Sequence, residues 1–359
     1  MKYRYWLSNI KGLSNLKLKM IYDNNIKPEE IYDNPRIIIN KMYGCVEKDV
    51  ECIEESKKKW NLDMEWEKFL EKSINFVSID MPEYPQKLKN IHNAPYSLYY
   101  IGKLPNQNRK AVAIVGARGR SGYGSEVARK ISGELAKYNI DVISGMAKGI
   151  DADGHIGALD VRGDTYAVLG CGVDVCYPAS NRYIYNRIVD CGGIISEYAP
   201  GTKPAQYFFP ARNRIISGLS DYIVVIEARE KSGSLITADY AMEQGKDVYA
   251  VPGRITDSLS GGCNSLIKQG AGVINNIDEF IKDILAEDDF YCSQIDFRKN
   301  LLEKDELLVY SLLDFRAIGL SELMEKLPME LYEIINILEN LCNKGFAREI
   351  NPNFYIKTL

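Results

Sequence analysis

The sequence predicts an α/β protein built on an extended Rossmann-like, doubly wound and mostly parallel β-sheet, with a small helical domain before it and a winged-helix domain after it. Short, continuously apolar runs alternate with amphipathic helical stretches in the middle of the chain, as expected for strands that are covered on both faces. The 359 residues exceed what one hydrophobic core usually serves, so we expect domains over residues 1–72, 73–288 and 302–359.

The first domain is predicted to be helical. Residues 10–25, IKGLSNLKLKMIYDNN, are typical of two helices around a glycine turn and loosely resemble a helix-hairpin-helix. The second glycine of that DNA-binding hairpin is absent, which argues against a DNA contact there. Residues 80–110 are rich in Pro, Asn and Tyr and predict a strand-and-turn connector into the sheet.

The strands of the central domain are expected where the apolar runs contain many β-branched residues. These runs are AVAIV, DVIS, TYAVL, GIIS, YIVVIE, DVYAVP and GVI, at residues 111–115, 141–144, 165–169, 193–196, 222–227, 247–252 and 272–274. The stretches between them, such as 124–139 and 233–246, have apolar residues at helical spacing. Repeated β-α alternation implies right-handed crossovers and helices on both faces of the sheet.

The C-terminal third follows a predicted linker at 289–301. Three amphipathic segments and a hairpin candidate at 346–357 have the order of a winged helix. The third segment carries Glu330, Glu333 and Glu339 against Lys344, a balance that repels phosphate. This charge favours a protein-contact or accessory role over DNA reading, and both alternatives stay open.

The net charge is −4, but its distribution leaves the middle of the chain free to bind a polyanion. Residues 1–108 and 109–254 each carry a net charge of +2, whereas residues 255–359 carry −8. No apolar run reaches the ~20 residues that span a bilayer, and no apolar signal core is present, so we expect a cytoplasmic protein without membrane contact. With eight cysteines in no CxxC pair and only two histidines, no metal site is expected.

The stretch VAIVGARGRSGYG, residues 112–124, joins an apolar strand to a loop with four glycines and two arginines. Its glycine spacing, G-x-x-G-x-x-G, matches neither the dinucleotide fingerprint nor a Walker P-loop. An anion site of backbone amides near Gly116, with Arg118 and Arg120 as added cations, fits this pattern. A tight strand-to-helix turn with solvated arginines is the alternative.

The loop after the next strand, SGMAKGIDADGH at 144–155, repeats this arrangement with Gly145 and Lys148. Loops that follow consecutive parallel strands meet at the carboxyl edge of the sheet, where ligands of open α/β folds bind. Asp151 and Asp153, together with His155, suggest a metal, but the positions of the glycine and the acidic residues depart from the calcium loop. Asp151 as a helix cap fits better.

Residues 207–220, YFFPARNRIISGLS, combine aromatic and cationic side chains. Phe209 precedes a proline, after which Arg212, Asn213 and Arg214 open an apolar helix. Aromatic faces beside arginines are what a single-stranded nucleic-acid groove needs. An aromatic core contact with surface arginines is the alternative.

Residues 227–241, EAREKSGSLITADYA, bring Lys231, Ser232 and Gly233 to the start of a helix after the next strand. A cation, a hydroxyl and free amides at one helix start favour anion binding, and a plain helix cap is the alternative. The loop GCGVDVCYPASN, residues 170–181, is interpreted mainly as scaffold. No catalytic constellation appears, so these phosphate-type loops predict a binding protein rather than an enzyme, without a cofactor.

Together and in order, these stretches resemble the DNA-processing protein A family, also written DprA or Smf. The family's Gly-x-Arg…Tyr-Gly loop is matched at 116–124 and its S-G-x-A-x-G-I-D segment at 144–151. Further matching segments lie at 167–178, 196–198, 209–216, 232–238, 250–253 and 262–271. The resemblance covers residues 75–285.

The resemblance implies a cytoplasmic homodimer of natural transformation that binds incoming single-stranded DNA without strong sequence preference. It also implies help in loading the RecA recombinase, in the presence of single-strand-binding protein, with no catalytic turnover. The family pattern assigns three kinds of DNA contact. Phosphates would be held by the side chains of Arg118, Lys148, Arg212, Arg214 and Lys231. Backbone amides would come from Gly116, Gly145 and Gly233, and the ring of Phe209 would stack on a base.

Two other classes of function compete with a DNA-binding mediator. One is a nucleotide hydrolase of the phosphoribohydrolase-like Rossmann type, whose P-G-G-x-G-T-x-x-E loop has its nearest counterpart at Pro252, Gly253 and Arg254. The glycine run and the glutamate of that loop are missing here. The other is a structural scaffold, which the density of arginines near the predicted strand ends disfavours.

Overall fold

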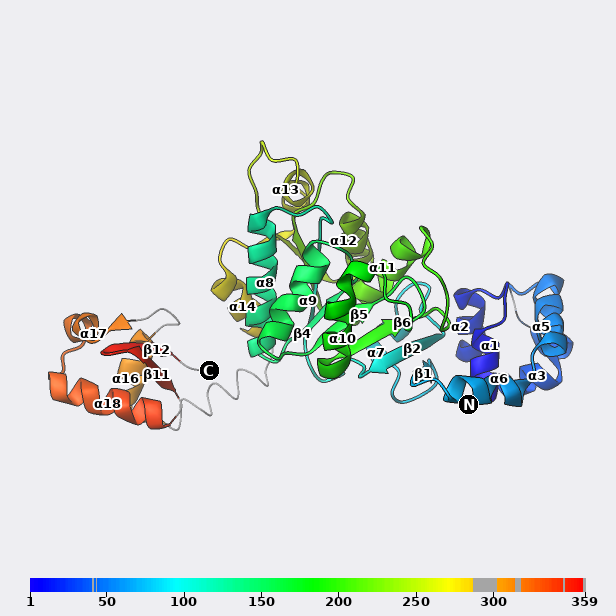
Figure 1. The fold of residues 1–359 in the computed structure, drawn as a ribbon, viewed down its shortest axis with the longest axis horizontal. Coiled ribbons are helices and arrows are strands. Elements are labelled where there is room, and N and C mark those ends of the chain that lie inside the picture. The colour runs from blue at the N-terminus through cyan, green and yellow to red at the C-terminus, as the bar shows by residue number, and fades with distance from the viewer. Residues whose placement is uncertain (41, 43, 287–301, 314–317, 345, 358–359) are drawn as a thin grey trace. The chain divides into compact units, whose positions relative to one another are not determined.

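The computed structural model describes residues 1–40, 42, 44–286, 302–313, 318–344 and 346–357 (Figure 1). These residues form two compact units, 1–277 and 278–359. The predicted linker at 289–301 lies outside the described residues. The three predicted domain ranges stay predictions.

The first unit is built on a nine-stranded sheet with the order β1-β2-β6-β5-β4-β3-β7-β8-β9. Its strands are β1 (Asn75–Ser78), β2 (Ser97–Gly102), β3 (Ala111–Gly116), β4 (Asp141–Ser144), β5 (Thr165–Val168), β6 (Gly193–Ser196), β7 (Tyr222–Ile226), β8 (Asp247–Ala250) and β9 (Gly272–Val273). Strands β3 to β9 pair in parallel, whereas β1 and β2 form an antiparallel edge. The predicted α/β fold with a mostly parallel sheet is therefore confirmed.

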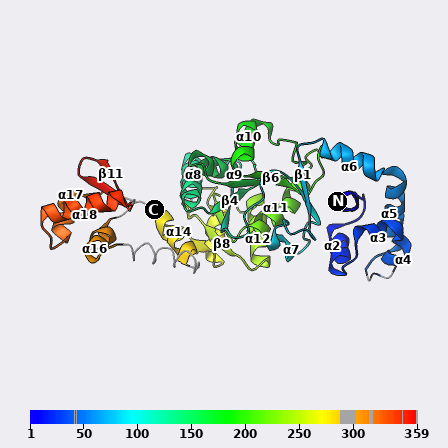
Figure 2. The same ribbon diagram turned by 90° about the horizontal axis from the view of Figure 1, so that it is seen from below.

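Helices cover both faces of this sheet, and Figure 2 shows α8 to α10 on one side with α7, α11 and α12 on the other. The helices are α7 (Gln86–Lys89), α8 (Gly122–Lys137), α9 (Ile150–Asp160), α10 (Arg182–Cys191), α11 (Phe208–Leu219), α12 (Gly233–Glu243) and α13 (Gly261–Lys268), with a short 3-10 turn, η1 (Ala179–Asn181). The strands are buried on both faces because alternate side chains serve two cores. In β3, Ala113 and Val115 join the core under α11, while Ile114 faces Gly154 of α9.

The direction of the chain through the sheet reverses at β3. From β3 the chain adds β4, β5 and β6 on one side, and then it crosses to β7, β8 and β9 on the other. The loops that follow the neighbouring strands β3 and β7 therefore lead away in opposite directions at the carboxyl edge of the sheet. In open α/β sheets this switch point is the place where ligands bind.

Six helices precede the sheet: α1 (Lys2–Ser8), α2 (Asn15–Asp23), α3 (Pro28–Asp33), α4 (Pro35–Ile39), α5 (Glu47–Lys59) and α6 (Leu62–Leu70). Gly12, at φ 93°, forms the turn between α1 and α2. Trp6 and Ile31 are fully buried in a core that is continuous with residues of the sheet. Asn9 Nδ2 also donates to the Tyr99 hydroxyl of β2 at 2.8 Å, so these helices pack on the antiparallel edge.

The second unit has its own apolar core, which includes Val309, Leu323, Ile334 and Leu338. Its elements are α14 (Ile277–Ala286), which begins at the boundary, α16 (Lys304–Leu312), β10 (Ile318–Gly319), α17 (Leu320–Lys326), α18 (Leu331–Asn343), β11 (Ala347–Asn351) and β12 (Phe354–Lys357). Strands β11 and β12 form the expected antiparallel hairpin, and β10 pairs with β12. The winged-helix assignment stays a prediction.

Candidate nucleic-acid interface

A pocket of about 660 Å³ opens at the carboxyl edge of the sheet, at the switch point. The loops after β3 and β7 and the first turns of α11 and α12 form its walls. Eight of the predicted site residues line this pocket: Gly116, Arg118, Phe209, Arg212, Asn213, Lys231, Ser232 and Gly233. Segments that are far apart in the sequence thus meet at one edge, as the order of strands and loops predicts.

The loop after β3 is shaped by close packing of its backbone against β7. A Cβ atom on Gly116 would overlap the carbonyl oxygen of Ile226, so only glycine fits there. Beyond it, the amides of Arg118 and Gly119 donate no hydrogen bond within the part of the chain that the structure describes. These two groups remain available to an anion in the pocket.

Glu227 fixes the far end of the same loop. Its carboxylate accepts hydrogen bonds from the Ser121 amide, at 2.8 Å, and from the Ser121 hydroxyl, which caps α8 through the Gly124 amide at 3.0 Å. Glu227 has φ 54°, an uncommon conformation for a residue other than glycine. The loop that carries Arg118 is therefore held by a strained residue at the end of β7.

A guanidinium and two aromatic rings form a row on the pocket wall. The Arg118 guanidinium carbon lies 5.8 Å from the centroid of the Phe209 ring. The Phe209 ring stacks on the Tyr177 ring, with centroids 5.4 Å apart and planes at 26°. Tyr177 is 46% exposed and lines the pocket, although the sequence analysis interpreted its loop as scaffold. Its position after β5 is the signal that could have revealed it.

Arg212 forms the buried floor of the pocket and is not an exposed phosphate ligand. Its Nη1 donates to the carbonyl oxygens of Gly145, at 2.7 Å, and Val168. Burial lowers the pKa of Arg212 and raises the pKa of nearby Asp151, and each charge partly offsets the burial of the other. Asp151 in turn accepts a hydrogen bond from the Gly145 amide at 3.2 Å. Because this amide already has a partner, the structure disfavours the predicted phosphate contact of Gly145.

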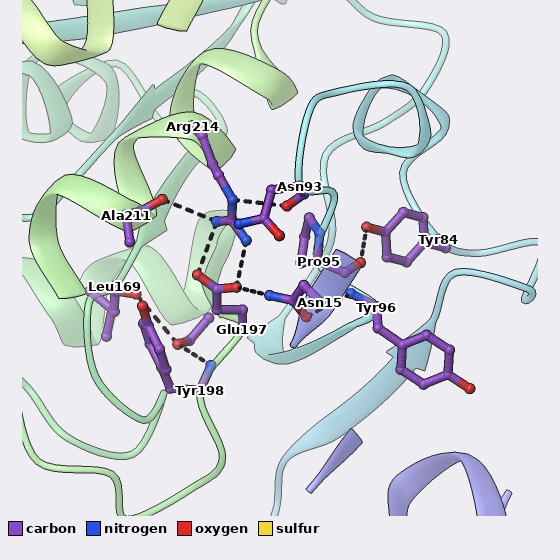
Figure 3. Close-up of polar contacts among 11 residues, drawn as sticks. Asn15, Tyr84, Asn93, Pro95, Tyr96, Leu169, Glu197, Tyr198, Ala211 and Arg214 are labelled. Carbon is purple, nitrogen blue, oxygen red and sulfur yellow. Dashed lines mark hydrogen bonds and ion pairs between the residues drawn. The ribbon is translucent and has the colours of Figure 1, made fainter. Parts of the chain in front are cut away.

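Arg214 does not line the pocket, which disfavours the prediction that it contacts DNA. Figure 3 shows the polar contacts of Arg214. Its Nη2 lies 2.6 Å from Glu197 Oε2, and the two side chains are 4% and 8% exposed. Glu197 Oε2 also accepts from Asn15 at 2.9 Å, while Arg214 Nε donates to the Asn93 carbonyl at 2.9 Å. Residues two apart on a helix face different sides, so Arg212 and Arg214 are not expected to reach one groove.

The remaining cations differ in their freedom to bind a ligand. Arg120 lies outside the pocket lining. Its Nε is 2.6 Å from Asp153 Oδ2, so its charge is already paired. Lys148 is exposed just beyond Ala147, which lines the pocket. Lys231 is exposed on the pocket wall, just before the start of α12.

The helix start at α12 combines a cap with a polar wall. Ser232 accepts from the Ser234 amide at 3.4 Å and so caps the helix. Asn213 Nδ2 donates to the Gly233 carbonyl at 3.2 Å, which joins the first turns of α11 and α12. Sequence reasoning missed Arg229 and Thr237 on this wall, and the pocket lining includes both.

Metal and membrane signals are absent from the described residues. No group of three or more His, Cys, Asp or Glu side chains there is placed to hold a metal ion. Burial lowers the pKa of His155 to about 3, and its Nδ1 lies 2.7 Å from the Thr165 hydroxyl. Within the same described ranges, no helix combines the length and hydropathy needed to cross a membrane.

Comparison with known proteins gives consistent matches. Protein Smf of Synechocystis sp. is 38% identical over 288 residues, which cover 79% of this chain and 72% of that protein. DNA processing protein DprA of Streptococcus pneumoniae is 44% identical over 207 residues, 58% of this chain and 72% of that one.

Two solved structures share the fold. The crystal structure of DprA from Streptococcus pneumoniae superposes with a TM-score of 0.67 and 34% identity, covering 78% of this chain and 97% of the other. DNA processing protein A from Helicobacter pylori, whose structure describes a single-stranded DNA binding mode, gives a TM-score of 0.54 and 30% identity, covering 59% and 97%. The family model of DNA recombination-mediator protein A matches residues 75–285, which hold the whole nine-stranded sheet. By sequence and by fold, the chain belongs to the DNA recombination-mediator protein A family.

Proposed function

We propose that this protein processes DNA by binding single strands in the pocket at the switch point. The observation that carries the proposal is the row of Arg118, Phe209 and Tyr177, which stands beside Lys231 on the same pocket. Rings of this kind stack on bases, and the cations and unpaired loop amides suit phosphates. A duplex keeps its bases stacked inside, so aromatic rings on the pocket wall favour a single strand.

The proposal assigns fewer side chains of the pocket to phosphate binding than the sequence predicts. Arg118 and Lys231 bind phosphates, Phe209 and Tyr177 stack on bases, and Arg212 supports the floor.

A titration of fluorescent oligo-dT over a range of salt concentrations tests the proposal. We expect affinity to fall steeply with salt, because each neutralised phosphate releases counterions. Arg118→Ala should weaken binding several-fold and reduce the slope of log affinity against log salt by about one. Lys137→Ala removes one exposed charge at the last turn of α8, away from the pocket, and should leave both unchanged.

Two results would contradict this function. An oligo-dT affinity that is equal for the wild-type protein and Arg118→Ala would exclude the pocket as the binding site. Hydrolysis of a nucleoside monophosphate, without affinity for oligo-dT, would favour the phosphoribohydrolase-like alternative.

Beyond strand binding, we propose that the protein acts in the cytoplasm as a homodimer that helps load RecA during natural transformation. The support is the family membership, since relatives are named for DNA processing. Light scattering at micromolar concentration should give twice the 40.6 kDa chain mass. RecA assembly on DNA covered with single-strand-binding protein should be faster with the protein present. A monomer mass, or an unchanged assembly rate, would remove the respective claim.

A further inference from the structure

We propose that the bound strand leaves the pocket over a second subsite, the β5-side strip, made of Tyr177, Arg182, Tyr183 and Lys148. This inference rests on the proposed function, because it assigns a path to the same single-stranded polynucleotide. The strip supplies two cations and two exposed rings next to the pocket.

The order of strands sets the direction of this path. Strands β7, β3, β4 and β5 are neighbours and run in parallel, so the loops that follow them lie side by side along one edge. Neighbouring strands are ~4.8 Å apart, and a polymer lying across their ends therefore crosses these loops in that order. The pocket lies mainly over the loops after β7 and β3 and also reaches Ala147 after β4 and Tyr177 after β5. The loops after β4 and β5 continue beyond it.

The strip is joined rigidly to the pocket. Two residues connect the strip to the pocket. Tyr177 belongs to both, and Ala147, which lines the pocket, directly precedes Lys148 of the strip. The buried side chain of Asn181 donates from Nδ2 to the carbonyl oxygens of Met146, at 2.9 Å, and Ala147, at 3.3 Å. These bonds tie the loop after β4 to the start of α10. Lys148 and Arg182 each directly follow a residue of this bridge.

The strip's cations form no ion pair and its rings are exposed, although each has an aromatic or cationic neighbour. The Arg187 guanidinium carbon lies 5.4 Å from the centroid of the Tyr183 ring, and Tyr177 stacks on Phe209. The Arg182 guanidinium carbon lies 5.7 Å from the centroid of the Tyr185 ring. Lys148 and Arg182 are exposed, and neither forms an ion pair in the part of the chain that the structure describes. Tyr183 is 69% exposed, more than Tyr177. Cations without an ion-pair partner beside exposed rings are the pair of features that a single-strand groove combines.

The opposite direction along the edge is less suited to phosphates. Past the loop after β7, the surface hollows are lined by Glu230, Asp239 and Asp257, all exposed. Two cations lie among them: Arg254, and Lys231, which one of the hollows shares with the pocket. The acidic side chains repel the phosphates of a strand there, so the β5 side is the favoured exit. Arg254 offers a matched control on the disfavoured side.

Oligonucleotide length separates the strip from the pocket. Oligo-dT of about six nucleotides fills the pocket alone, whereas about twenty nucleotides also reach the strip. In the full-length protein, Arg182→Ala combined with Tyr183→Ala should weaken binding of the long oligonucleotide about tenfold and of the short one less than about twofold. Arg182→Ala alone should reduce the salt slope by about one for the long oligonucleotide only. Both side chains are exposed, and an unchanged Tm checks that the variants fold.

Arg254→Ala serves as the matched control, because it removes one exposed arginine from the same edge on the other side. We expect it to leave both lengths unchanged. The strip is excluded if its variants bind the long oligonucleotide as tightly as wild type, if they lose the short one equally, or if Arg254→Ala causes the length-dependent loss. Absence of binding at either length by the wild-type protein would instead contradict the proposed function.

Discussion

Two arginines that look equivalent in the sequence differ at the scale of single residues. Arg118 is exposed on the pocket wall, whereas Arg214 is buried against Glu197. Arg118 follows Ala117 and Arg214 follows Asn213, and neither neighbour shows whether the arginine will be buried. The difference arises from the partner, because Glu197 comes from a distant segment and neutralises Arg214 in the interior.

Arg214→Ala should therefore destabilise the protein rather than remove a DNA contact. It leaves Glu197 buried without a counter-charge, which costs about 3–5 kcal/mol of unfolding free energy. Denaturant unfolding should show this loss. Under conditions where the variant remains folded, its salt slope for oligo-dT should equal that of wild type. A slope reduced by one with unchanged stability would show that Arg214 contacts phosphate after all.

Asp141, at the start of β4, makes the stability depend on pH in acid. Burial raises its pKa from 3.8 to about 6, while Arg109, whose Nη1 is 3.3 Å away, partly opposes this shift. Between these two values the folded state binds more protons than the unfolded state, so stability falls as pH rises. Asp141→Asn should flatten this dependence, measured as unfolding free energy between about pH 4 and pH 6. A curve as steep as that of wild type would contradict this assignment.

At the scale of elements, the strands and their connecting helices were predictable, but the walls of the pocket were less so. Continuous apolar runs identify β3 to β9 because such strands are buried on both faces. Nothing in a single sequence shows that the 170–181 loop brings Tyr177 onto Phe209, because that contact depends on how the loops after β5 and before α11 fold back. Strand β2 lies in the predicted strand-and-turn connector, residues 80–110, whereas β1 lies just before it and was not predicted.

The first turn of α8 offers a matched pair of glycines. A Cβ atom on Gly124 would overlap the Glu227 carboxylate, while one on Gly122 meets open space. Gly124→Ala should therefore cost about 1–3 kcal/mol and weaken oligo-dT binding, since the loop with Arg118 must shift. Gly122→Ala should be neutral or stabilise by at most about 1 kcal/mol, with binding unchanged. Thermal unfolding and titration together check this, and equal behaviour of the two variants would contradict the role of Glu227.

At the scale of the whole molecule, the sheet combines two tasks. Its antiparallel edge carries the six N-terminal helices, through contacts such as the bond from Asn9 to Tyr99. Its switch point carries the pocket, and the second unit has a separate core. The net negative charge of the chain does not oppose this function, because the pocket lining and the β5-side strip contain the exposed cations that a strand would meet.

A crystal structure of the protein with bound oligo-dT tests the central claim most directly. The account predicts phosphates within hydrogen-bond distance of Arg118 and Lys231, and bases against Phe209 and Tyr177. The strand should then run toward Arg182. A strand bound on another face, with Arg118 exposed to solvent, would contradict it.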